Sequence, residues 1–364
     1  MNPSDMSDLT DMSEKKFSAA DVQIALAADA PDEASLAALL SPAAAEFLEP
    51  MAARAQALTR RHFGRTIQLY IPLYLSSYCS GGCAYCGFAA DRKTERHALP
   101  FDAVVKELDA INAMGFEEIL LLTGERGAHA DLDYLCECVA LAARRFHTVA
   151  VEVFPMSEEE YRRLARAGAV SSTLYQETYH PQTYELMHRW GPKKDYANRL
   201  DAPSRALAAG FRFAGLGALL GLADPRFDLL ALYRHVRRLQ KQFWSAGVTV
   251  SFPRLRSEAG GFTPPFPVSD RMLAQFIFAF RIVLPDVPLV LSTREAAPFR
   301  DGIAGIGINK MSIASKTTVG GYSGGGSQEG QFDVSDDRAL APFCDMLKRK
   351  QLEPVFKNWD EIYR

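Results

Sequence analysis

The sequence predicts an α/β fold of the (β/α)8 barrel type, with a helical extension before the barrel and a helix and tail after it. Short apolar or alternating runs, which are typical of strands, take turns with amphipathic stretches, which are typical of helices, along most of the 364 residues. Eight runs suit strands, and helix-like stretches lie between them. This regular alternation favours a parallel sheet that closes into a barrel.

The composition bounds the function classes. The chain is 48% hydrophobic and 23% charged, with a net charge of −3, which is ordinary for a soluble globular protein. The charge gives no reason to expect nucleic acid as a partner. No apolar run is long enough to span a membrane, and the N-terminus lacks the pattern of a signal peptide. We therefore expect a cytoplasmic protein.

The segments before the barrel differ from it in composition. Residues 1–15 are polar and acidic, so we expect them to be disordered. Residues 16–64 are rich in Ala, Leu, Glu and Arg and predict a helical extension, with one helix at 32–40 and another at 42–61.

Residues 65–318 are predicted to form the barrel. The expected strands are 67–75, 118–123, 148–153, 169–175, 212–218, 248–252, 288–292 and 305–311. The expected helices are 101–114, 131–145, 157–167, 196–209, 228–246, 270–284 and, more weakly, 295–301.

Residues 319–364 follow as a Gly-rich loop, a helix and a tail. The loop, 320–330, could serve as a linker or as a lid, and the helix is expected at 338–350.

Three cysteines directly after the first predicted strand carry the strongest chemical signal. Cys79, Cys83 and Cys86 have the spacing C-x3-C-x2-C, which puts three thiolates in one loop and leaves out a fourth. A metal site that does chemistry keeps one position open, and thiolates are the usual ligands of iron–sulfur clusters. The alternative is a zinc loop whose fourth ligand lies elsewhere. The remaining cysteines, Cys136, Cys138 and Cys344, show no ligand spacing.

Polar residues gather at the ends of other predicted strands, which is the face where barrel active sites lie. The second strand ends in Thr123-Gly124-Glu125, a glycine followed by a carboxylate. The fourth ends in a polar run, 175–180, that contains Gln176 and Glu177 and suits recognition of a ribose or a substrate. The alternative for this run is a capped turn that opens the next helix.

Two arginines follow the sixth and seventh strands. Arg254 lies in Ser251-Phe-Pro-Arg-Leu-Arg256, and Arg294 lies in Ser292-Thr-Arg-Glu295. Guanidinium groups pair bidentately with carboxylates, so two of them at one mouth indicate an anionic substrate such as an amino acid. The alternative is that one of them pairs with Glu295 as part of the scaffold.

The cysteine triplet, with Tyr85 just before the last cysteine, resembles the signature of the radical S-adenosylmethionine (SAM) enzymes. The resemblance implies a [4Fe–4S] cluster on Cys79, Cys83 and Cys86, whose open iron binds the amino and carboxylate groups of SAM. It further implies SAM contacts from a set of residues at the strand ends. In this sequence they are Tyr85, Gly124 and Glu125 (the amine), Gln176, Glu177, Arg199 (the carboxylate) and Gly217 (space for the adenosine). For Arg199 the alternative is a surface ion pair with Asp201.

Longer stretches are similar to one family, the 2-iminoacetate synthases, the tyrosine lyases of thiamine thiazole biosynthesis. The likeness covers about residues 65 to 360, including 72–88, 120–125, 175–180, 215–222, 251–256, 291–295 and 354–360. It implies that L-tyrosine is cleaved between Cα and Cβ to 2-iminoacetate and 4-methylphenol. Ser292 and Arg294 would hold the substrate carboxylate, with Arg254 nearby. Thiazole synthase would take the product, and a flavodoxin or ferredoxin would supply electrons.

Three alternatives differ in substrate or in class. The tyrosine lyases of hydrogenase maturation need a second cluster after the barrel, and only Cys344 lies there, so we do not expect that activity. The sequence does not exclude a lyase of similar fold that acts on tryptophan, because the residues of the aryl pocket cannot be placed. A zinc-stabilised binding protein is the alternative from another class.

Overall fold

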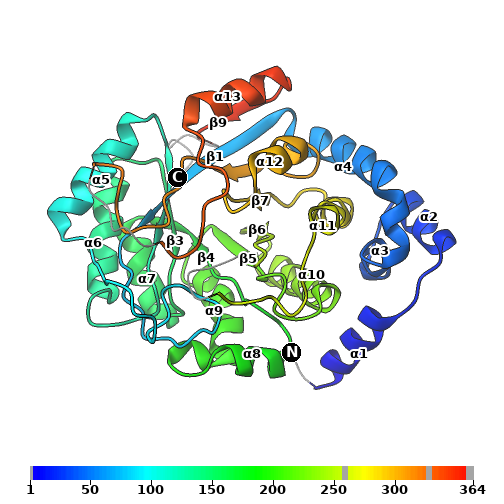
Figure 1. Ribbon diagram of the computed structural model, residues 1–364, viewed down its shortest axis with the longest axis horizontal. Coiled ribbons are helices and arrows are strands. Elements are labelled where there is room, and N and C mark those ends of the chain that lie inside the picture. The colour runs from blue at the N-terminus through cyan, green and yellow to red at the C-terminus, as the bar shows by residue number, and fades with distance from the viewer. Residues whose placement is uncertain (1–2, 256–260, 325–329, 358–364) are drawn as a thin grey trace.

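The computed structural model describes residues 3–255, 261–324 and 330–357, and these form a closed barrel of eight parallel strands with helices around it (Figure 1). Each strand pairs with the next, and β1 pairs with both β2 and β8, which closes the sheet. The strands are β1 (Thr66–Tyr74), β2 (Glu118–Leu122), β3 (Thr148–Glu152), β4 (Ala169–Thr173), β5 (Phe213–Gly217), β6 (Gly247–Ser251), β7 (Leu289–Leu291) and β8 (Lys310–Ser312). The predicted fold class is confirmed.

Helices cover the outside of the barrel, and strands such as β1, β2 and β3 present apolar side chains on both of their faces. In chain order they are α5 (Phe101–Ala113), α6 (Leu132–Ala143), α7 (Glu158–Ala167), α8 (Pro181–Met187), α9 (Tyr196–Ala208), α10 (Pro225–Gln242), α11 (Asp270–Val283), α12 (Ala297–Ile303) and α13 (Leu340–Arg349). Local sequence defines several ends. Ser157 and Glu160 form a capping box that opens α7, and Gly168 in the left-handed region closes it.

The N-terminal helices pack against one side of the barrel, next to α10 and α11 (Figure 1). They are α1 (Pro3–Glu14), α2 (Ala19–Ala27), α3 (Glu33–Leu39) and α4 (Leu48–Phe63), with a 3-10 turn at Pro42–Phe47. The side-chain amide of Gln275 on α11 donates to the carbonyls of Leu39 and Ser41, at 2.9 Å each.

The expectation of disorder at 1–15 is wrong for residues 3–14, which form α1. Leu9 is fully buried, and Asp8 pairs with Arg234 of α10. The polar composition hid this helix because its stability comes from tertiary contact with α10, not from its own sequence.

Three further differences from the prediction concern segment ends. The eighth strand begins only at Lys310, because Gly305 and Gly307 adopt positive φ angles that break an extended run. The helix α8 directly follows the polar run 175–180 and is absent from the predicted helices. A ninth short strand, β9 (Glu353–Val355), pairs in parallel with the start of β1 outside the closed barrel. Within the described ranges, no helix is both long enough and apolar enough to cross a membrane.

Candidate active site

The three cysteines lie in the loop between β1 and α5, at the end of the barrel where the strands terminate. Two arginines of the same loop tie its backbone together. Arg96 donates to the carbonyls of Ser77 and Phe88, at 2.7 and 2.9 Å, and Arg92 donates to that of Ala84 at 2.9 Å. These contacts hold an otherwise irregular loop in one conformation.

The sulfurs of Cys79 and Cys83 both lie close to Gly81. A β-carbon built on Gly81 would lie 3.6 Å from Cys79 Sγ, 3.9 Å from Cys83 Sγ and 3.5 Å from Glu125 Cγ. Cys79 Sγ accepts from the backbone N–H groups of Gly81 and Glu125, both at 3.4 Å. Such N–H···S contacts are typical of cluster-bound thiolates, whose potential they tune.

The arrangement suits a cluster better than a single ion. Among the described residues, no three His, Cys, Asp or Glu side chains are placed to hold one metal ion. A zinc site needs its ligands to converge on one atom, whereas a cubane takes one sulfur at each of three irons. Burial raises the pKa of Cys83 to about 12, and a cysteine that binds a metal gives up its proton on binding. The donor set therefore fits a [4Fe–4S] cluster with three cysteine ligands.

Gly124 lets the end of β2 approach the cysteine loop. A β-carbon at this position would lie 2.4 Å from the carbonyl oxygen of Tyr78 and 2.7 Å from Cys79 Cβ. The expectation was that this glycine admits a ligand. The structure shows that the neighbour is the cysteine loop itself, and the close contact places Glu125 beside Cys79.

Glu125 belongs to a buried network of two carboxylates and two cations. Arg199 Nη1 donates to Glu125 Oε1 at 3.0 Å, and Arg199 Nη2 donates to Glu177 Oε1 at 3.4 Å. Lys193 Nζ donates to the same Glu177 oxygen at 2.6 Å. Burial by itself would raise the pKa of Glu177, but Lys193 and Arg199 hold it below its usual value.

Two polar side-chain atoms of the predicted site residues have no hydrogen-bond partner among the described residues. They are Glu125 Oε2 and Gln176 Nε2, and both are buried. A buried polar atom without a partner is costly and therefore uncommon. Glu125 Oε2 thus offers an acceptor to a ligand beside the cysteine loop.

The surface alternative for Arg199 is wrong, because its guanidinium is buried and Asp201 pairs with Arg205 instead. The polar run after β4 serves two purposes. Glu177 lies in the network and has a φ of 70°, a strained value for a residue with a side chain. The residues after them form the capped turn that the sequence left as an alternative, with His180 capping α8.

The structure does not support the expectation that Gly217 leaves space for the adenosine of SAM. A β-carbon there would lie 2.7 Å from Tyr175 Cδ1 and 2.9 Å from the carbonyl oxygen of Ser251. The space beside Gly217 therefore holds the ring of Tyr175, not an open path for an adenosine. Gly217 acts by allowing Tyr175 to pack against β5.

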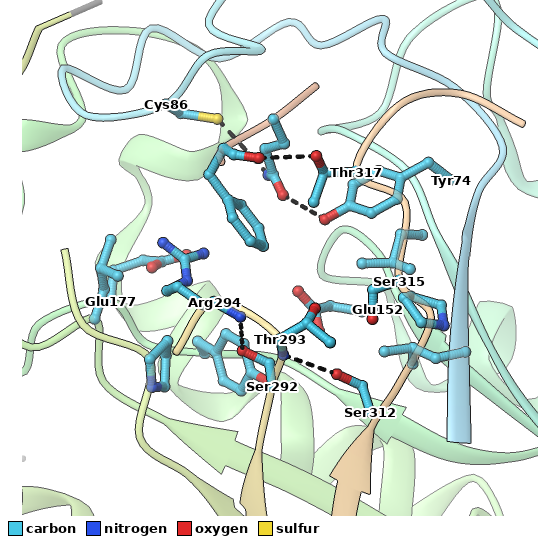
Figure 2. A pocket seen from close by; sticks show the side chains of 18 of the residues that line it. Tyr74, Cys86, Glu152, Glu177, Ser292, Thr293, Arg294, Ser312, Ser315 and Thr317 are labelled. Carbon is cyan, nitrogen blue, oxygen red and sulfur yellow. Dashed lines mark hydrogen bonds between the residues drawn. The ribbon is translucent and has the colours of Figure 1, made fainter. Parts of the chain in front are cut away.

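A cavity of about 130 Å³ lies next to the cysteine loop, inside the barrel mouth (Figure 2). Ser292 and Arg294 line one wall, and Ser292 Oγ accepts from the backbone N–H of Arg294 at 3.4 Å. The Arg294 guanidinium lies 3.6 Å from the ring centre of Phe332. The two predicted substrate residues thus reach the same cavity as Cys86, Tyr85 and Glu177.

Arg254 has a different position from the one expected. It is buried and donates to both oxygens of Glu295, to Asp270 and, at 2.8 Å, to the carbonyl of Val268. Its donors are used within the protein, so direct contact with a substrate is not what this geometry favours. The alternative, a scaffold pair with Glu295, describes Arg254, while Arg294 is the arginine that lines the cavity.

Four residues of the site were missed by the sequence reasoning. Tyr85 OH donates to His188 Nε2 at 2.8 Å, and His188 Nδ1 donates to the carbonyl of Tyr184. Lys193 holds Glu177, and Gln331 reaches Cys86 and Tyr74. Glu152 lines the cavity at the end of β3. Only Glu152 could have been found, because it lies one residue before the end of the predicted strand 148–153, at the same face as Glu125.

Comparisons with known proteins agree with this geometry. The radical SAM superfamily model matches residues 73–232, and that of the biotin and thiamin synthesis associated domain matches residues 251–353. The chain is 42% identical over 343 residues to the 2-iminoacetate synthases of Salmonella typhimurium and Escherichia coli, covering 94% of this chain and 91% of each relative.

Solved structures give the same picture. A crystal structure of HydG, a maturase of the [FeFe]-hydrogenase, matches with a TM-score of 0.90 and 29% identity, covering 98% of this chain and 80% of that one. HydG from Carboxydothermus hydrogenoformans matches with a TM-score of 0.81 and 31% identity, covering 99% and 81%. Methylornithine synthase, at 18% identity and a TM-score of 0.72 over 92% and 96% of the two chains, shares the fold.

Proposed function

The chain belongs to the 2-iminoacetate synthase family of the radical SAM superfamily, and on that premise we propose how its cavity cleaves L-tyrosine. It is a radical SAM carbon–carbon lyase. The reaction breaks the Cα–Cβ bond of tyrosine and yields 2-iminoacetate and 4-methylphenol, while SAM is converted to methionine and 5′-deoxyadenosine. One observation carries the assignment of residues: Cys86 of the cysteine loop, Glu177 and Arg294 line one cavity, and Arg199 joins Glu177 to Glu125.

The cluster is assigned to Cys79, Cys83 and Cys86. When bound, the reduced cluster and SAM supply a 5′-deoxyadenosyl radical that removes a hydrogen atom from the substrate. The protein's part is to hold the loop rigid through Arg92 and Arg96 and to direct N–H groups at Cys79. These contacts fix where the open iron would face.

The SAM site is assigned to the network around Arg199. The unpartnered Glu125 Oε2 is the acceptor for the SAM amino group, and Arg199 is the nearby cation for its carboxylate. Gln176 Nε2 supplies a donor, and Glu177 contributes a further acceptor. Tyr85, held by the neutral His188, forms part of the wall between this site and the cavity.

The substrate carboxylate is assigned to Ser292 and Arg294. A charged hydrogen bond from a guanidinium fixes one end of the amino acid, which aligns its amine for hydrogen-atom removal. Burial lowers the pKa of Arg294 from its usual value, although Arg294 stays protonated at neutral pH. Arg254 supports this wall indirectly: its pair with Glu295 holds the residue that directly follows Arg294.

The product is proposed to pass to thiazole synthase, in keeping with the thiamin synthesis associated region of the chain. A low-potential carrier such as a flavodoxin or ferredoxin is the proposed electron donor.

Anaerobic turnover tests the function. The reconstituted protein, incubated with L-tyrosine, SAM and dithionite, is expected to form 4-methylphenol and 5′-deoxyadenosine. L-Tryptophan in place of tyrosine is the matched control for the aryl pocket. Formation of 3-methylindole from tryptophan, with no 4-methylphenol from tyrosine, would overturn the substrate assignment.

A further inference from the structure

Glu152 is a carboxylate inside the substrate cavity that the roles above leave unused. It is the last residue of β3 and lines the cavity (Figure 2). Its side chain makes no hydrogen bond and no ion pair with any residue in the part of the chain that the structure describes. The other carboxylate of the cavity wall, Glu177, is bound by Lys193 and Arg199. Glu152 is therefore available to a ligand.

Strand register places Glu152 beside an apolar surface. Glu152 pairs with Leu122 of β2, and Leu122 pairs with Tyr74 of β1. Leu120, Leu122 and Tyr74 also line the cavity. A flat aromatic ring could lie against these side chains with a polar group directed at the carboxylate, which is the usual composition of a specific small-molecule pocket.

The ionisable groups around Glu152 are three tyrosines, the carboxylate of Glu177 and three cations. The cations are Arg294, Arg199 and Lys193. Burial raises the pKa of Tyr70, Tyr74 and Tyr175, so these phenols stay protonated. Burial, with a further contribution from Glu177, raises the pKa of Glu152 to about 7, against the opposing effect of Arg294, Arg199 and Lys193. Glu152 is thus the group of this wall that can exchange a proton near neutral pH.

The positions of the two carboxylates orient the substrate. Glu177 and Glu152 lie on opposite sides of Arg294 in Figure 2. With the substrate carboxylate at Arg294, the amino group must face the SAM network on the Glu177 side. The aryl group then extends toward Glu152 and its apolar neighbours.

We propose that Glu152 binds the phenol hydroxyl of tyrosine and accepts its proton as the Cα–Cβ bond breaks. This inference rests on the proposed function. After hydrogen-atom loss from the amine, one electron of the Cα–Cβ bond completes the C=N bond of 2-iminoacetate. The other electron remains on the aryl fragment, which transfers its phenol proton to Glu152. A low-potential one-electron donor, of the class that reduces the cluster, and one proton at the benzylic carbon then complete the methyl group. Glu152 returns its proton to the oxygen, and 4-methylphenol leaves.

The variants Glu152→Gln and Glu152→Leu test, without turnover, whether Glu152 binds the phenol hydroxyl of tyrosine. The affinities of the SAM-loaded, cluster-containing protein for L-tyrosine and L-phenylalanine are compared by calorimetry. We expect the wild-type protein to prefer tyrosine and E152L to lose about 10- to 100-fold of tyrosine affinity with little change for phenylalanine. E152Q, which keeps an acceptor oxygen, should fall between them. An equal loss for both amino acids would overturn the proposal, because Glu152 would then act on the amine or on the structure.

The ratio of 4-methylphenol formed to 5′-deoxyadenosine formed tests whether Glu152 accepts the phenol proton. E152Q should still form 5′-deoxyadenosine with tyrosine, but the rate of 4-methylphenol formation should fall by about 100-fold or more. A fluorinated tyrosine with a more acidic phenol should recover part of that loss. Unchanged coupling in E152Q would refute the role. If E152Q fails to hold its cluster, Glu152→Asp, which keeps the charge, must retain the preference for tyrosine over phenylalanine.

Two controls separate this inference from the function itself. Glu137→Gln, at an exposed position of α6, should match the wild type in every measurement. A wild-type protein that forms no 4-methylphenol from tyrosine would refute the proposed function, whereas a normal wild type with a fully active E152L would refute the Glu152 role alone.

Discussion

The side-chain amide of Gln331 donates to Cys86 Sγ at 3.7 Å, across 245 residues of sequence. The amide oxygen of Gln331 accepts from Tyr74 OH at 2.8 Å, and the next residue, Phe332, lies over the Arg294 guanidinium. One short C-terminal segment therefore touches the proposed cluster, the cavity wall and the proposed substrate arginine.

We expect Gln331→Leu to make the reduction potential of the cluster more negative. An N–H···S hydrogen bond stabilises the more electron-rich sulfurs of the reduced state, so its removal disfavours reduction. A redox titration followed by electron paramagnetic resonance measures the shift, and Gln331→Glu, which removes the donor but keeps the shape, should shift the potential in the same direction. An unchanged potential in both variants would show that Gln331 only closes the cavity.

Gly124→Ala should weaken the cysteine loop. Its methyl group would overlap the carbonyl of Tyr78 and Cys79 Cβ, and such overpacking costs about 1–3 kcal/mol. We expect a lower iron and sulfide content after anaerobic reconstitution. Gly127→Ala is the matched control, since no atom lies within 4 Å of its added carbon. Equal iron content in the two variants would contradict the role given to Gly124.

Glu125→Gln should lower the affinity for SAM by about 10- to 100-fold, because it removes the charge that would meet the SAM amino group. Arg199 would also lose a buried ion-pair partner, so thermal unfolding must be recorded alongside the calorimetric titration. Asp201→Asn, at an exposed position of the same helix as Arg199, should leave SAM binding unchanged. Undiminished SAM affinity in Glu125→Gln would remove Glu125 from the site.

Substitution of Arg294 should impair turnover, whereas substitution of Arg254 should impair stability. Arg294→Ala should reduce kcat/KM for tyrosine by roughly 10- to 100-fold and keep the cluster, since it loses a contact with the substrate. Arg254→Ala leaves Glu295 buried without its cation, which should cost about 3–5 kcal/mol of unfolding free energy. Denaturant unfolding with parallel kinetics separates these outcomes, and a reversed pattern would exchange the two roles.

Glu152 should make stability depend on pH. Its pKa is about 7 in the folded protein and near its ordinary value when unfolded, so between about pH 4.5 and 7 the unfolded chain binds fewer protons than the folded one. The free energy of unfolding should therefore fall as pH rises through this window, by at most about 3 kcal/mol from this group. Asp228, whose pKa burial also raises to about 7, contributes in the same direction.

A comparison of the wild type with Glu152→Gln separates the contribution of Glu152 to the pH dependence of stability from that of Asp228. The variant keeps Asp228 and should show a smaller fall in unfolding free energy from pH 5 to 8, measured by urea unfolding. Identical slopes would indicate that solvent in the cavity keeps the pKa of Glu152 near its ordinary value.

The barrel could be predicted because its signals are local. Each strand is an apolar run, and motifs at strand ends must meet at one face once the strands are parallel. That rule was enough to select the cysteine loop, Glu125 and the Ser292–Arg294 pair. It could not find α1, whose burial depends on α10. It also could not find Lys193, His188 and Gln331, which lie in a 3-10 turn, at the end of α8 and in a loop, where no spacing or periodicity marks them.

By itself the sequence determined the class of fold, the cluster loop and the family, since these depend on short-range pattern and on residue identity at strand ends. Tertiary structure alone decided which arginine pairs with Glu295 and which lines the cavity. It also decided that Gly217 accommodates Tyr175 and that Glu152 has no hydrogen-bond or ion-pair partner within residues 3–255, 261–324 and 330–357. The physical reason is that a side chain's role depends on which charges and walls surround it, and barrel closure brings those neighbours from distant parts of the chain.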